Sequence, residues 1–97
     1  MTVLSDELLH MLGEGRFDAP HDILGPHPAP DGGWVVRVRR PLAESVAVEH
    51  GEVSVPLTHR AHGVWEGLFD SDPRPYVVRA HYRDGLEDAS ADPYMFS

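Results

Sequence analysis

Short runs of alternating apolar and polar residues dominate the chain after residue 33. The run "WVVRVRR", for example, places Trp34, Val36 and Val38 on one face of an extended strand. Runs of this kind occupy residues 34–40, 45–50, 52–57, 63–69, 76–82 and 86–89. Several short strands at spacings of roughly 8–12 residues, without long crossovers between them, are typical of an all-β sandwich. We therefore predict an immunoglobulin-like β-sandwich of short antiparallel strands.

The first 17 residues predict a short helix in front of the sandwich. Leu4, Leu8 and Leu12 recur at helical spacing, Ser5 is a suitable N-cap, and Gly13 ends the pattern. At 97 residues the chain has the length of one domain. The predicted organisation of domain 1–97 is a leader helix over 1–17, a loop over 18–33 and the sandwich over 34–97.

The predicted loop 18–33 is rich in proline and glycine and leads into the first predicted strand. It contains one apolar pair, Ile23 and Leu24. Exposure of this pair would be unfavourable, so we expect it to plug one end of the sandwich, with the leader helix beside it. Tight turns are predicted further on, at Gly51 and at Gly85.

Histidines and aspartates gather in the same loop, at Asp18, His21, Asp22, His27 and Asp31. Such side chains can ligate zinc. However, the two histidines are six residues apart among prolines, which matches no common zinc motif. We predict that they hydrogen-bond backbone groups, and we expect neither a metal nor a cofactor.

No arrangement of residues in this sequence indicates catalysis by the chain alone. The serines lack a G-x-S-x-G motif. Glu66 and Asp70 would lie on one strand face about 13 Å apart, at ~3.3 Å per residue, and are interpreted as a solvated face. Catalysis by this chain alone is therefore not expected.

The charge of the chain restricts its partners. The formal net charge is −8, from 16 acidic and 8 basic residues. An acidic domain repels phosphate backbones and anionic lipid, so we expect neither nucleic-acid nor membrane binding, whereas neutral sugars and proteins remain compatible. The sequence lacks cysteine and a signal-peptide pattern at its N-terminus, which favours a cytoplasmic location.

Aromatic residues are the best candidates for ligand contact. Trp34, Trp65 and Tyr76 could stack on pyranose rings, an interaction that requires no charge. The alternative is that they are core residues, because small sandwiches usually bury their large aromatics. For Trp65, which shares a face with Phe69, burial is the favoured interpretation.

Several short patterns occur in an order that resembles one known family. They are "DAPHDILGPH" at 18–27, "VRVRRPLAESVAV" at 36–48, "GVWEG" at 63–67, "YVVRAHYRDG" at 76–85 and "DPYMF" at 92–96. In this order they resemble the N-terminal β-sandwich domain of bacterial 1,4-α-glucan (glycogen) branching enzymes. The motif residues that carry the resemblance, with an expected structural role, are Pro20, His21, Leu24, Gly25, His27, Asp92, Pro93 and Tyr94.

The resemblance implies an accessory domain. Enzymes of that family cleave an α-1,4 linkage of a glucan and transfer the released chain to a 6-hydroxyl, and their catalytic carboxylates lie on a (β/α)₈ barrel. No barrel motif occurs in this sequence. The implied partners are that barrel and an α-1,4-glucan, and the implied effect is on glucan positioning or transferred chain length. The alternative is a generic immunoglobulin-like interaction or glucan-binding module with no catalytic partner in its chain.

Overall fold

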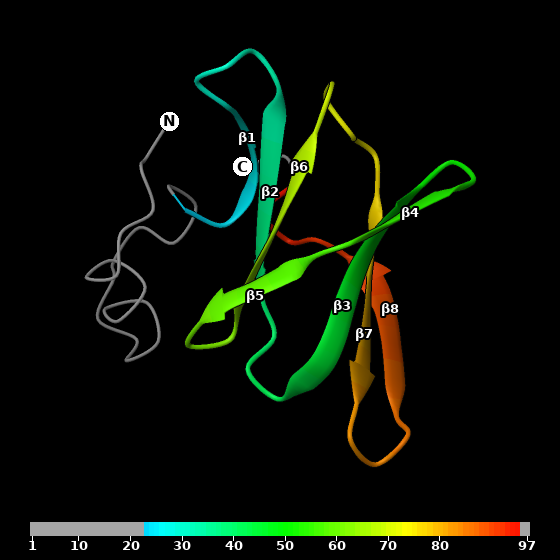
Figure 1. Ribbon diagram of the computed structural model, residues 1–97. Helices are drawn as coiled ribbons and strands as arrows, with labels where there is room; N and C mark the ends of the chain where they lie inside the picture. Colours follow the sequence, from blue (N-terminus) through cyan, green and yellow to red (C-terminus); the bar gives the residue numbers. More distant parts are fainter. Residues whose placement is uncertain (1–22, 96–97) are drawn as a thin grey trace.

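The structure is a computed structural model, and it describes residues 23–95 (Figure 1). Every regular element in this range is a strand, which confirms the predicted all-β fold. The strands are β1 (Gly25–Pro28), β2 (Trp34–Arg39), β3 (Ala43–His50), β4 (Val53–Pro56), β5 (Thr58–Ala61), β6 (Val64–Phe69), β7 (Val77–Tyr82) and β8 (Glu87–Ala91). The predicted leader helix over 1–17 lies outside the described residues.

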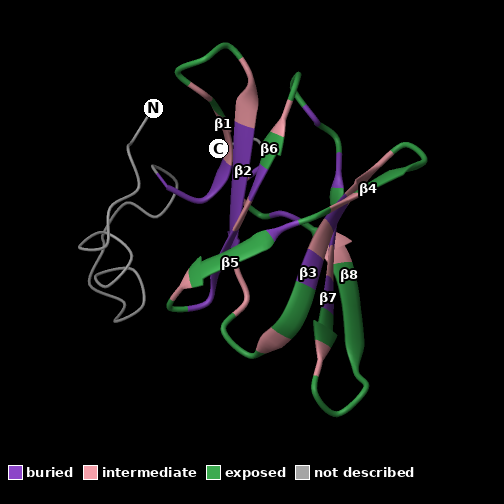
Figure 2. Cartoon of the chain, viewed as in Figure 1, coloured by how far each residue is buried: buried purple, intermediate pink, exposed green. Residues whose placement is uncertain are grey.

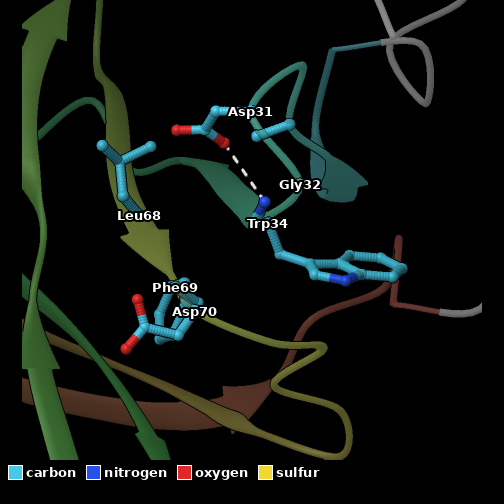
Figure 3. A pocket seen from close by; sticks show the side chains of 8 residues that line it. Asp31, Gly32, Trp34, Leu68, Phe69 and Asp70 are labelled. Carbon is cyan, nitrogen blue, oxygen red and sulfur yellow. Dashed lines mark hydrogen bonds between the residues drawn. The ribbon is translucent and has the colours of Figure 1, made fainter.

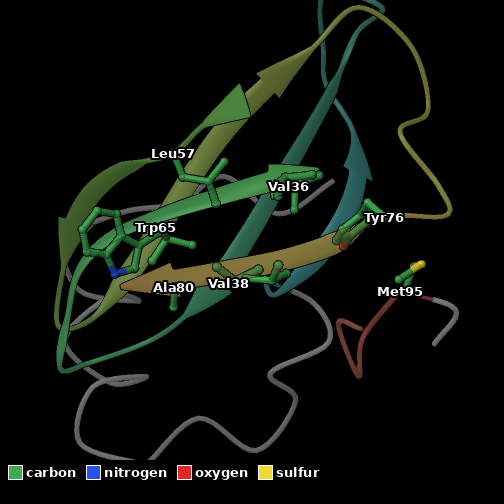
Figure 4. Packing of buried hydrophobic residues seen from close by; sticks show 10 residues of the cluster. Val36, Val38, Leu57, Trp65, Tyr76, Ala80 and Met95 are labelled. Atoms are coloured by element: carbon green, nitrogen blue, oxygen red, sulfur yellow. The ribbon is translucent and has the colours of Figure 1, made fainter. Parts of the chain in front are cut away.

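Two antiparallel four-stranded sheets form the sandwich. One has the strand order β1-β2-β6-β5, and the other has the order β4-β3-β7-β8 (Figure 1). Burial is concentrated in the central strands, as Figure 2 shows. The core between the sheets includes Val36, Val38, Trp65, Tyr76 and Val78, with Trp65 and Tyr76 far apart within it (Figure 4). Alternating apolar residues thus supply the contact surface between the sheets.

The chain passes from one sheet to the other at Leu57. This residue is buried between β4, which pairs with β3, and β5, which pairs with β6. Its side chain occupies the space above Gly67, where an added Cβ would lie 2.4 Å from Leu57 Cδ2. The sequence predicts strands over 52–57 and 63–69 with none between them, which is wrong for residues 58–61. The polar composition was misleading because β5 is an edge strand whose first three side chains are exposed.

The predicted loop over 18–33 also contains a strand. β1 pairs antiparallel with β2, from Gly25 opposite Arg37 to Pro28 opposite Trp34. Its two prolines favour a loop because proline has no N–H to donate, but proline is tolerated on an edge strand. Residues 25–28 therefore belong to the first sheet, although the predicted sandwich started at residue 34.

Both predicted tight turns are confirmed. Gly51 has a φ of 58° between β3 and β4, and Gly85 has a φ of 86° between β7 and β8. Glycine adopts positive φ without the steric cost that other residues meet. The amide of Tyr82 donates to the carbonyl oxygen of Leu86 at 2.9 Å and closes the second hairpin.

Ile23 and Leu24 are buried, as predicted, with exposed fractions of 0% and 5%. They form a separate cluster with Val64, against which Tyr94 packs. Val64 precedes the core residue Trp65 on β6, so the two side chains point to opposite faces of the sheet. The pair therefore covers the outer face of the first sheet and is not the end plug that the sequence suggested.

Candidate functional site

Three connections meet at the end of the sandwich where β2 begins. β6 ends at this level, with Phe69 opposite Trp34. In the other sheet β7 begins at Val77, opposite the last residue of β8, Ala91. The segments that meet here are the β1–β2 connection over residues 29–33, the β6–β7 connection over residues 70–76, and residues 92–95, which follow β8. Loops carried by two rigid sheets at a common end are the usual location of binding residues.

A pocket of about 450 Å³ opens between the first two of these segments (Figure 3). Its lining includes Asp31, Trp34, Leu68 and Asp70. A carboxylate oxygen of Asp31 accepts a hydrogen bond from the amide of Gly33 at 3.1 Å, which fixes the turn. The two carboxylates are acceptors that can bind the hydroxyl groups of a neutral ligand.

The indole ring of Trp34 extends away from the carboxylates of this pocket (Figure 3). The residue is partly exposed, and the guanidinium carbon of Arg74 lies 5.1 Å from the ring centroid. That distance is within the range of a cation–π interaction. The pocket and the indole are therefore neighbouring features, and a guanidinium covers part of the aromatic surface.

Asp72 holds Arg74 in this position. Its carboxylate accepts from Nε of Arg74 at 2.9 Å and from Nη2 at 2.5 Å, and it also accepts from the Arg74 amide at 3.0 Å. The hydrogen bond from Arg74 lowers the pKa of Asp72, and the same bond raises the pKa of Arg74. This pair was not predicted from the sequence, although an Asp two residues before its partner is a common turn pattern.

Tyr76 is a core residue at this end. Its exposed fraction is 3%, and its hydroxyl donates to Oδ2 of the buried Asp92 at 2.5 Å. Burial, together with this hydrogen bond, raises the pKa of the Tyr76 hydroxyl well above its usual range. Its ring therefore has little surface to offer a sugar.

Trp65 is also a core residue, with an exposed fraction of 8%. Its indole N–H donates to the carbonyl oxygen of Arg40 at 3.1 Å, and its ring lies 4.9 Å from that of His59. The structure thus separates the three predicted contact residues: Trp65 and Tyr76 lie between the sheets, and Trp34 alone is partly exposed.

Several motif residues within the described range lie close to one another or to the backbone. Gly25 has a φ of 93°, and an added Cβ would lie 2.7 Å from the carbonyl oxygen of Tyr94. A ring nitrogen of His27 is 3.0 Å from the carbonyl oxygen of Leu24, as predicted for a histidine that bonds the backbone. Asp92 is buried and Pro93 is exposed. Pro20 and His21 lie outside the described residues.

Glu66 differs from its predicted role on a solvated strand face. Its carboxylate is largely buried between two arginines, accepting from Arg37 Nε at 2.7 Å and from Arg60 Nη1 at 2.8 Å. Arg37 is itself only 4% exposed. Asp70, by contrast, is exposed as predicted. Glu66 is therefore a structural ion-pair residue on the outer face of the first sheet.

A second pocket, of about 720 Å³, lies at the opposite end of the sandwich. It is formed by the connection between β2 and β3 and by the β7–β8 turn. Leu42 and Leu86 line it with exposed fractions of 82% and 64%, beside the half-buried Tyr82. An apolar surface of this kind is typical of contacts between proteins.

Within residues 23–95, no group of three histidine, cysteine or acidic side chains is arranged to hold a metal ion. In the same range no helix has the length and hydropathy needed to cross a membrane.

The two four-stranded antiparallel sheets define a small β-sandwich module. A structural neighbour is a pullulanase from Paenibacillus barengoltzii, solved in complex with maltohexaose and alpha-cyclodextrin. The TM-score is 0.63 at 21% identity, and the match covers 87% of this chain and 16% of the pullulanase. At this identity the likeness concerns the fold alone.

Sequence comparison is more specific. The family of the alpha-1,4-glucan branching enzyme GlgB, N-terminal domain, matches residues 5–94, and the chain belongs to this family. It is 37% identical to 1,4-alpha-glucan branching enzyme GlgB of Leifsonia xyli, over 96% of this chain and 14% of that protein. It is 44% identical to the enzyme of the same name from Rhodococcus jostii, over 91% of this chain and 12% of that protein. The chain thus spans about an eighth of the length of these relatives.

Proposed function

We propose that this chain acts as the N-terminal accessory domain of a 1,4-α-glucan branching enzyme. The observation that supports the proposal is the family match over residues 5–94, together with the 12–14% share of each relative that the chain covers. The parent enzyme cleaves an α-1,4 linkage and transfers the released chain to a 6-hydroxyl, using residues outside this domain. The domain influences how the glucan is positioned and which chain length is transferred.

The accessory role is tested in the parent enzyme. Branched product is made by the enzyme with and without residues 1–97, and it is then debranched for chain-length analysis. The proposal expects continued branching with a shifted distribution of transferred chain lengths. An unchanged distribution at an unchanged rate would contradict it.

Direct contact with glucan is proposed for Trp34. It is the only one of the three predicted aromatic residues that is partly exposed, and Asp31 and Asp70 supply hydroxyl acceptors in the adjacent pocket. Titration of the chain with maltohexaose, followed by backbone and indole NMR signals, should shift the signals of Trp34 and its neighbours. The Trp34→Ala variant should abolish the shifts, whereas no movement at millimolar ligand would remove this part of the proposal.

A second candidate function is docking on the rest of the parent chain without sugar contact. The exposed Leu42 and Leu86, which lie together at the far end of the sandwich, favour it. Their burial in the parent would explain an otherwise unfavourable apolar surface. Amide exchange of residues 42–44 in the parent, compared with the isolated chain, distinguishes this function, because docking predicts slower exchange in the parent only.

A further inference from the structure

The side chain of Arg74 joins two parts of the molecule that are far apart in sequence. Its guanidinium carbon lies 5.1 Å from the Trp34 ring centroid, at the start of β2. Its Nη1 donates to the carbonyl oxygen of Met95 at 3.4 Å, in the segment that follows β8. Asp72 binds Nε and Nη2, which leaves Nη1 for Met95. One side chain therefore covers the aromatic surface and also holds the C-terminal segment.

The C-terminal segment is fixed on its other side by the core. The amide of Met95 donates to the carbonyl oxygen of Asp92 at 3.1 Å, and the amide of Tyr94 donates to the Asp92 carboxylate at 2.9 Å. The Met95 side chain is buried between the sheets. Residues 92–95 therefore form an ordered turn, and Arg74 is the contact between this turn and the Trp34 surface.

We propose that Arg74 is a latch that shields the Trp34 indole and couples its exposure to the C-terminal turn. The inference rests on the proposed glucan contact at Trp34. A pyranose ring that stacks on the shielded face has to displace the guanidinium, because both need the same aromatic surface. The displaced Arg74 loses its hydrogen bond to Met95. Glucan binding at Trp34 and the hydrogen bond between Arg74 and Met95 are therefore mutually exclusive.

The latch is tested by whether Arg74→Ala raises or lowers the affinity of the chain for maltohexaose. Arg74→Ala removes the competitor and should tighten maltohexaose binding by roughly two- to fivefold, the factor that an exposed cation–π contact is worth. An arginine that instead donated hydrogen bonds to the sugar would weaken binding when removed. Weaker or unchanged binding in the Arg74→Ala variant overturns the proposal.

Two further variants control this measurement. Arg83→Ala removes the same charge from the exposed turn at the opposite end of the sandwich, and it should leave the affinity unchanged. Asp72→Asn weakens the support of Arg74 and keeps the arginine, so it should tighten binding by less than Arg74→Ala does. Equal tightening in the Arg83 variant would indicate a general charge effect and would contradict the latch.

A measurement without ligand separates the latch from the glucan contact. In Arg74→Ala, the indole N–H signal of Trp34 should shift and the amides of Tyr94 and Met95 should exchange faster, with the buried indole of Trp65 as the internal reference. If these changes occur but no variant binds maltohexaose, the glucan contact fails and the contact function of Arg74 stands. If the signals of Trp34 and Met95 are unaffected, the latch fails whatever the affinity.

Discussion

The hydroxyl of Tyr76 donates a 2.5 Å hydrogen bond to the carboxylate of Asp92, and both residues are nearly inaccessible to solvent. Tyr76 lies directly before β7, and Asp92 lies directly after β8. The bond therefore ties the two ends of a hairpin to each other and fixes the start of the segment that follows β8. It also gives the "DPY" part of the family motif a physical role.

Removal of the Tyr76 hydroxyl should destabilise the domain. Tyr76→Phe leaves the buried Asp92 carboxylate without this donor, and loss of a hydrogen bond to a charged group costs about 1.5–3 kcal/mol. Urea unfolding monitored by circular dichroism measures the change. Tyr82→Phe, the same atom removed at the other end of β7, should cost less than about 0.5 kcal/mol. Equal effects of the two variants would refute a special role of the pair.

Alkaline pH should weaken the fold through the same tyrosine. The folded-state pKa of Tyr76 is raised above its unfolded value of about 10, because burial and Asp92 disfavour the phenolate. The stabilisation is complete below the unfolded pKa and is lost as the pH rises towards the folded pKa. The free energy of unfolding should then fall by up to about 1.4 kcal/mol per pH unit above pH 10. Tyr76→Phe should reduce that slope, and parallel curves for the two proteins would contradict the assignment.

Leu24 should be a major contributor to stability, although it lies outside the core between the sheets. It is 5% exposed in the cluster with Ile23 and Val64. Truncation of a buried leucine to alanine costs about 2–5 kcal/mol. Leu86→Ala, at a leucine that is 64% exposed, is the matched control and should cost less than about 0.5 kcal/mol. A small effect at Leu24 would show that the cluster adds little to the fold.

Much of the sandwich follows from local pattern. The alternation in β3 and β7 predicted which side chains face the core, and the glycines at 51 and 85 predicted the hairpins. The strands β1 and β5 were missed because both are edge strands, where prolines and polar side chains are tolerated and the pattern disappears. Both strands pair with the next strand along the chain, β1 with β2 and β5 with β6, so they were missed for want of an alternating pattern and not because their partners are distant in sequence.

The candidate site was harder to predict than the fold. Trp34, Trp65 and Tyr76 are equivalent as aromatic residues in the sequence, and only the packing of the two sheets decides which one reaches solvent. The contact of Arg74 with Trp34 joins residues 40 positions apart, one on the β6–β7 connection and the other at the start of β2. No local sequence pattern predicts this contact, because it depends on the two sheets ending at the same level.

Substitution of Gly25 should destabilise the domain more than substitution of Gly32, because the two glycines share a positive φ but only Gly25 is crowded by a neighbouring backbone. Gly25 has a φ of 93° and Gly32 a φ of 96°, so alanine is strained at both positions. An added Cβ at Gly32 meets nothing within 4 Å, whereas at Gly25 it would lie 2.7 Å from the backbone oxygen of Tyr94. Gly25→Ala should therefore destabilise the domain by at least about 1 kcal/mol more than Gly32→Ala, because the two backbones have to separate.

Urea unfolding of both alanine variants measures the difference, and the amide signals of Asp92, Tyr94 and Met95 report its origin. With Gly25→Ala these signals should move, since the C-terminal turn packs against β1 at this point. With Gly32→Ala they should remain in place. Equal losses of stability in the two variants, with unchanged Tyr94 signals, would mean that Gly25 is needed only for its positive φ. A larger loss of stability in Gly25→Ala would mean that the absence of a side chain at Gly25 also allows the backbone of Tyr94, in the "DPY" motif, to pack closely against it.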